Sequence, residues 1–90
     1  MPVVCMAILS VKDWQALQNL NNEIFVSKAR ALNARCHQIY RDPSNPSQAL
    51  LWVEVPGLED AYEMREIVVE QVKMLPDLVL SDDWLWEPIE

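Results

Sequence analysis

The sequence has little cysteine, little positive charge and almost no glycine. Its 90 residues include two cysteines, one histidine and one glycine. Two cysteines are too few for the disulfide framework of a small secreted domain. The absence of a Cys-x-x-Cys motif or a Cys/His cluster argues against a structural zinc site. Seven basic residues against fourteen acidic ones give a net charge of −7, which disfavours nucleic acid and anionic membranes as partners.

Long apolar stretches are missing as well. The opening run of residues 1–9 is too short to span a bilayer, and it lacks the basic leader and small-residue cleavage site of a secretory signal. We therefore expect a cytoplasmic protein. Apolar residues nevertheless make up 51% of the chain, with four tryptophans, which excludes disordered and low-complexity classes. The length predicts a single domain over residues 1–90 with a thin core, because short chains bury a smaller fraction of their surface.

The first half of the chain predicts a strand, a helix and a second strand. Residues 3–11 form an apolar run, rich in β-branched residues, that is typical of a strand buried on both faces. From Trp14 to about residue 32 or 33, apolar residues recur every three or four positions, as on the buried stripe of a helix. The predicted stripe consists of Leu17, Leu20, Ile24, Lys28 and Ala31. Residues 34–41 follow as a second strand.

The second half predicts a hairpin, a helix and a last strand. Residues 42–47 combine two prolines with short hydrogen-bonding side chains, which indicates a loop. We expect strands at 49–55 and 78–81 and a helix at 58–75. The predicted inner stripe of that helix includes Leu58, Ala61, Arg65, Val68 and Val72. Asp82 and Asp83 interrupt the last strand before extended structure resumes over residues 84–87, which allows a short fifth strand.

These elements run in the order βαββαβ. Two strand–helix–strand halves of similar build predict the ferredoxin-like α+β arrangement, in which a four-stranded antiparallel sheet carries both helices on one face. The second face should be apolar too, because both sets of alternating residues in the run 3–11 are apolar and Trp52 points outward from strand 49–55. Such a sheet needs a cover on both faces. We therefore expect a symmetric homodimer with sheets packed face to face, anchored by Trp84 and Trp86.

A family resemblance supports this fold. The element order, the length near 90 and the ending Trp86-Glu87-Pro88-Ile89 after a strand resemble the dimeric α+β barrel superfamily. Within it the sequence is similar to small antibiotic-biosynthesis-monooxygenase-like proteins. The resemblance covers nearly the whole chain and rests on pattern rather than on a signature motif. It implies a homodimer whose sheets enclose a cavity, in some members an oxygenase site for aromatic substrates that uses neither metal nor flavin. We accordingly expect no cofactor.

His37, Trp52 and Arg35 are the candidate site residues. His37 is the only histidine, and on the face away from the helices, beside Arg35 and Trp52, it would transfer protons inside the barrel. Trp52 would offer a ligand a flat apolar wall and one N–H donor. The alternatives are a structural histidine and an interface tryptophan. The spacing predicts no Ser/His/Asp triad, and a single histidine supports no metal site.

Two functions fit these patterns. The first is a homodimer that binds a small aromatic or apolar ligand between its sheets, with cofactor-independent monooxygenase activity as one form of it. The second is a non-enzymatic dimer with a filled interior that binds another protein. The uneven charge favours the second, since residues 51–90 contain eleven acids and two bases. The acids at helical spacing are expected to form a solvated outer face: they are Glu59, Asp60, Glu63, Glu66 and Glu70.

Overall fold

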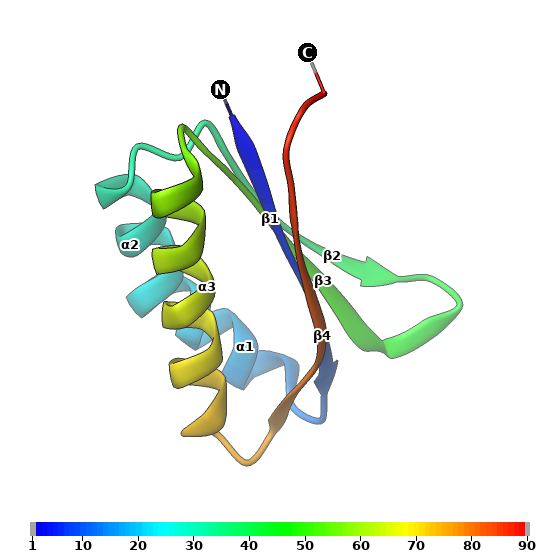
Figure 1. Cartoon of the computed structure of the whole chain (residues 1–90). Helices are drawn as coiled ribbons and strands as arrows, with labels where there is room; N and C mark the ends of the chain where they lie inside the picture. Colours follow the sequence, from blue (N-terminus) through cyan, green and yellow to red (C-terminus); the bar gives the residue numbers. More distant parts are fainter. Residues whose placement is uncertain (1, 90) are drawn as a thin grey trace.

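A four-stranded antiparallel sheet with helices on one face makes up the structure (Figure 1). The computed structural model describes residues 2–89, and the strands lie in the order β2-β3-β1-β4. The elements are β1 (Val3–Val11), α1 (Trp14–Leu20), η1 (Asn21–Phe25), α2 (Val26–Ala31), β2 (Cys36–Asp42), β3 (Asn45–Val55), α3 (Leu58–Lys73) and β4 (Leu78–Trp86). The run from α1 to α2 forms the first predicted helix. The predicted ferredoxin-like α+β fold is confirmed.

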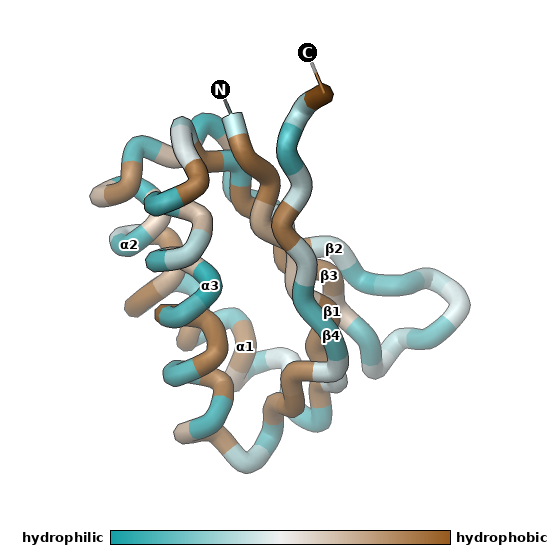
Figure 2. Tube along the Cα trace, viewed as in Figure 1, coloured by the Kyte–Doolittle hydropathy of each residue, from teal (hydrophilic) through white to brown (hydrophobic). Residues whose placement is uncertain are grey.

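The core lies between the sheet and the helices. Alternate residues of β1 enter it because successive side chains of a strand point to opposite faces. These buried residues are Val3, Cys5, Ala7, Leu9 and Val11. The helix α3 covers them with Ala61, Met64, Val68 and Val72. Figure 2 shows the hydrophobic colour continuing along β1, as the apolar run in the sequence predicts.

A π-turn shifts the buried stripe of the first helical segment. In η1 the backbone N–H of Val26 donates to the carbonyl of Asn21, five residues back, so the turn holds one residue more than an α-helix. The extra residue rotates everything that follows about the helix axis. The stripe predicted from regular α-helical spacing is therefore wrong at Lys28 and Ala31, whereas Ile24 is partly buried against the core as predicted. The buried residues are Leu17, Leu20, Phe25 and Ala29, whereas Lys28 and Ala31 are exposed.

The predicted stripe of α3 is correct except at two positions. Leu58, the first residue of the helix, is exposed. Arg65 also lies at the surface, where its Nη2 is 3.1 Å from Oδ1 of Asp83 in β4. The acidic cluster faces solvent as predicted. Its exposed members are Glu59, Glu63, Glu66 and Glu70, and Asp60 is half-buried.

The last strand, β4, is continuous. Its register against β1 shifts between Leu80 and Asp82, so Ser81 is an extra residue that forms a β-bulge. The predicted interruption at Asp82 and Asp83 and the short fifth strand are therefore wrong. The hairpin between β2 and β3 is longer than predicted, because β3 begins at Asn45.

Candidate functional site

The pairing of β2 with β3 separates the predicted site residues. His37 lies opposite Val53, and Gln38 lies opposite Trp52. Residues that pair directly across two strands project from the same face of the sheet. Because Val53 is buried beneath the helices, His37 points into the helix layer and Trp52 points away from it. The predicted common face for His37 and Trp52 is therefore wrong.

His37 connects the sheet to the π-turn. Its Nε2 lies 2.7 Å from Oδ1 of Asn21 in η1, and since an amide oxygen only accepts, Nε2 carries the proton. Nδ1 is buried and makes no hydrogen bond within residues 2–89. Burial lowers the pKa of His37 below its usual value of 6.5, because a desolvated ring favours the neutral form. The contacts of His37 thus hold β2 against η1.

Arg35 lies just before β2 and contacts neither His37 nor Trp52 through a hydrogen bond or ion pair. Its backbone N–H donates to the carbonyl of Glu54 at 2.8 Å. Its Nε lies 3.7 Å from Oε2 of Glu54, with the Arg35 side chain 68% exposed. An exposed ion pair of this kind contributes only about 0–1 kcal/mol. Arg35 therefore lies at the edge of the sheet and does not form one site with His37 and Trp52.

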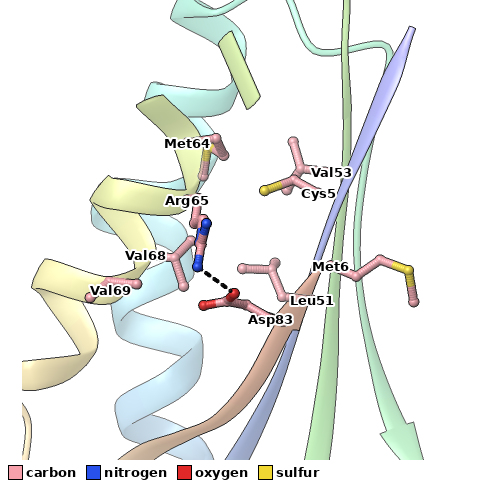
Figure 3. Close-up of a pocket in the computed structure, with 10 residues that line it drawn as sticks. Cys5, Met6, Leu51, Val53, Met64, Arg65, Val68, Val69 and Asp83 are labelled. Carbon is pink, nitrogen blue, oxygen red and sulfur yellow. Dashed lines mark ion pairs between the residues drawn. The ribbon is translucent and has the colours of Figure 1, made fainter. Parts of the chain in front are cut away.

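A small void lies between α3 and the sheet (Figure 3). Cys5 and Val53 border it from the sheet, and Met64 and Val68 border it from α3. Its volume is about 10 Å³, which is room for about one water molecule at most. The side chains of the core thus fill this space, and a ligand of several atoms does not fit there.

Two polar features lie at this void. The ion pair between Arg65 and Asp83, drawn as a dashed line in Figure 3, stands at its edge. The Sγ of Cys5 lies 3.7 Å from the carbonyl oxygen of Ala61. Burial, together with the negative charge of Asp83, raises the pKa of Cys5 to about 11. The thiol is therefore protonated near neutral pH and is a poor nucleophile.

The face of the sheet opposite the helices is apolar and aromatic, and we call it the open face. Trp52 of β3 and Trp84 of β4 pair with Met6 of β1 from either side. Figure 3 shows Met6 pointing away from the void and the helices. The open face comprises Val4, Met6, Ile8, Ser10, Cys36, Gln38, Tyr40, Gln48, Leu50, Trp52, Glu54, Val79, Asp82, Trp84 and Trp86. The second apolar face predicted from the sequence is therefore present.

A hollow of about 300 Å³ opens on this face. Ile8 and Leu50 contribute apolar side chains to it, and Tyr40 and Gln48 contribute polar groups. The lining also includes Arg41, Asp42 and Ala49. This volume is at the lower end of the range for small-molecule pockets, about 300–1,000 Å³. Sequence reasoning missed Tyr40 because only the register with β3 reveals that it lies beside Leu50 on the open face.

Within residues 2–89, no three His, Cys, Asp or Glu side chains come together in a group that could hold a metal ion. In the same stretch, no helix combines the length and apolar composition needed to cross a bilayer.

Comparison with known proteins finds similar structures but no similar sequences. No protein-family model matches the chain, and no curated protein is significantly similar to it. A protein of Nitrosomonas europaea, proposed to be an antibiotic biosynthesis monooxygenase, superposes with a TM-score of 0.73 at 14% identity, over 98% of this chain and 90% of its own. The chain shares its fold.

Two other solved structures give the same result. HapK from Hahella chejuensis has a TM-score of 0.65 at 9% identity, over 99% of this chain and 93% of HapK. A second proposed antibiotic biosynthesis monooxygenase, from Deinococcus radiodurans, has a TM-score of 0.63 at 17% identity, over 98% of this chain and 93% of its own. The likeness of fold that the element order suggested is confirmed. Identities this low leave function to be argued from the site.

Proposed function

We propose that this protein is a homodimer whose open faces pack against each other and enclose a small apolar or aromatic ligand. One observation carries the proposal: Trp52, Met6 and Trp84 lie side by side across three strands, and within residues 2–89 the helices all lie on the other face. A contiguous apolar patch on a protein surface marks a contact site. Trp84 and Trp86 are 38% and 56% exposed in the single chain, so they have much area left to bury.

A second copy of the chain is the partner that fits this surface. Two sheets pack face to face at about 10 Å with their side chains interdigitated, and a two-fold axis allows one patch to serve both subunits. Burial of apolar area contributes about 25 cal/mol per Å², so several large side chains from each subunit supply the driving force. The polar residues Gln38 and Glu54 lie beside the aromatic row, and a mixed apolar and polar composition is typical of interfaces.

The hollow provides the place for a ligand. It is open on one side in the single chain, and in the proposed dimer the partner's sheet covers it. Ile8 and Leu50 suit an apolar ring, while Tyr40 and Gln48 offer hydrogen-bonding groups that fix its orientation. Small-molecule sites commonly combine an apolar lining with a few polar groups in this way.

The proposal is restricted to binding. His37 lies under the helices and bonds to Asn21, so it does not bring a proton-transfer group to the open face. The polar side chains at the hollow, Tyr40, Asp42 and Gln48, bind and orient a ligand. The oxygenase reaction that the family resemblance implies therefore does not form part of the proposed function.

Sedimentation equilibrium and a neutral apolar probe test the two halves of the proposal. We expect twice the chain mass of 10.4 kDa and saturable binding of N-phenyl-1-naphthylamine, measured by its fluorescence. Leu50→Trp fills the hollow and should weaken probe binding at least about tenfold, or about 1.4 kcal/mol. Leu58→Trp, at an exposed position on α3, is the control and should bind like the wild type. A single-chain mass, or probe binding that Leu50→Trp leaves unchanged, contradicts the proposal.

A dimer with a filled interior that binds another protein is the second candidate. The exposed acidic side chains along α3 favour it, since Glu59, Glu63 and Glu66 offer a charged surface to a basic partner. The same experiment separates the two candidates. A dimeric mass together with no probe binding by the wild type supports this second candidate over the ligand-binding protein.

A further inference from the structure

One carboxylate, Asp42, borders the hollow on the open face, and a second, Asp82, lies on the neighbouring strand. Asp82 pairs with Ile8 across β1 and β4. One oxygen of each accepts a backbone N–H at 2.8 Å, Asp42 from Ser44 and Asp82 from Asp83. The second oxygen of each makes no hydrogen bond or ion pair within residues 2–89. Each carboxylate is thus held in place and can still accept a hydrogen bond from a ligand.

Positive charge is turned away from the hollow. Arg41 is the one basic residue of its lining, but it pairs with Ala49, which is buried beneath the helices. The guanidinium of Arg41 lies over the Trp14 ring, 4.4 Å from the ring centroid. The side chain of Arg35 forms its ion pair with Glu54. No cation therefore neutralises Asp42 at the hollow, among the residues that the structure describes.

Aromatic and apolar side chains complete the surroundings of the hollow. Tyr40 lies opposite Leu50 and is 50% exposed, and Trp52 is the next residue of β3 on the same face. Aromatic rings attract ammonium groups through their negative faces. Carboxylates do the same by Coulomb attraction, which grows as water is excluded. An anionic ligand would meet repulsion here and would also lose its hydration.

We propose that the hollow binds a primary arylalkylamine, with its ring on Ile8 and Leu50 and its ammonium group on Asp42. Asp82, one strand beyond Ile8, adds to the negative potential without direct contact. This inference rests on the proposed function, because the second sheet is what encloses the ligand. It specifies that the ligand is positively charged, whereas the proposed function does not state the charge of the ligand.

A series of three ligands with one skeleton tests the charge preference. Calorimetric titration compares 2-phenylethylamine, 2-phenylethanol and 3-phenylpropionate, which are cationic, neutral and anionic at neutral pH. We expect the amine to bind at least about tenfold more tightly than the alcohol, the size of a hydrogen bond to a charged group. The propionate should bind most weakly. Equal affinities for amine and alcohol, or tighter binding of the propionate, overturn the inference.

Substitutions test which carboxylate causes the tighter binding of the amine. Asp42→Asn keeps the oxygen that accepts the Ser44 N–H and should remove most of the advantage of the amine over the alcohol. Asp82→Asn should reduce that advantage by less, and Glu63→Gln on α3 is the control that leaves it unchanged. An amine advantage that survives Asp42→Asn overturns the inference. The proposed function fails separately, through a single-chain mass or through absent binding of N-phenyl-1-naphthylamine.

Discussion

The hydrogen bond between Asn21 and His37 joins an irregular helical turn to a strand at the edge of the sheet. It leaves Nδ1 of His37 buried without a partner within residues 2–89, and an unsatisfied buried polar atom costs about 1–3 kcal/mol. Protonation would add an N–H at Nδ1, which has no acceptor there. Only the neutral ring fits this environment, so His37 couples the stability of the fold to pH.

We predict that the free energy of unfolding falls as the pH drops below 6.5. Burial lowers the pKa of His37 in the folded protein from its usual 6.5, so the unfolded chain binds the proton more readily. The contribution of His37 to the free energy of unfolding is complete above pH 6.5 and is lost as the pH falls through the folded-state pKa. Urea unfolding from about pH 8 to about pH 5, the range in which histidine titrates, measures the loss.

His37→Gln is the matched control for this prediction. The variant should lack the part of the pH dependence that arises from His37, while the carboxylates contribute equally to both proteins. An NMR titration of the His37 ring gives the folded-state pKa directly. A midpoint at or above 6.5 would show that burial does not disfavour the charged ring.

At the scale of single elements, periodicity predicted some features and could not resolve others. The two faces of β3 followed from alternation, and the order of the elements along the chain followed from the apolar runs, the helical periodicity and the proline-rich loop. Ile24 and Phe25 are both apolar, so regular and shifted helical spacing fit the sequence equally well. In β2, His37 and Ile39 alternate with Gln38 and Tyr40, so each face mixes polar and apolar groups. Only the register with β3 places His37 under the helices.

The π-turn predicts an asymmetry between two single-residue deletions. Asn22 and Glu66 are both exposed. Deletion of Asn22 from η1 restores regular α-helical pairing and keeps the helical residues before and after it in phase. The free energy of unfolding should therefore fall by about 1–3 kcal/mol, the cost of one broken hydrogen bond. Deletion of Glu66 from α3 rotates Val68 and Val72 out of the core, at about 1.5–3 kcal/mol each. Chemical unfolding of both variants measures the difference, and equal losses would contradict the assigned turn.

The whole molecule is a sheet with two different faces. One face is closed by helices over a core whose void next to α3 is about 10 Å³, and the other carries an aromatic row and a hollow of about 300 Å³. The apolar second face was predictable because β1 is apolar at successive positions. The hollow was not predictable, since it depends on the β2–β3 register and on the shift of that register between Arg41 and Asp42. In the proposed dimer, a second copy of the chain covers this apolar face.

The solution mass of two variants tests this account most directly. Met6 lies between Trp52 and Trp84 at the centre of the open face, whereas Met74 is 70% exposed near the end of α3. Met6→Asp would bury an unpaired carboxylate in the dimer, at about 3–5 kcal/mol, and so weaken association at least about a hundredfold. Met74→Asp is the matched control. Sedimentation equilibrium should show dimers for the wild type and Met74→Asp and monomers for Met6→Asp at micromolar concentration. A wild-type monomer, or a Met6→Asp dimer of unchanged affinity, would contradict the account.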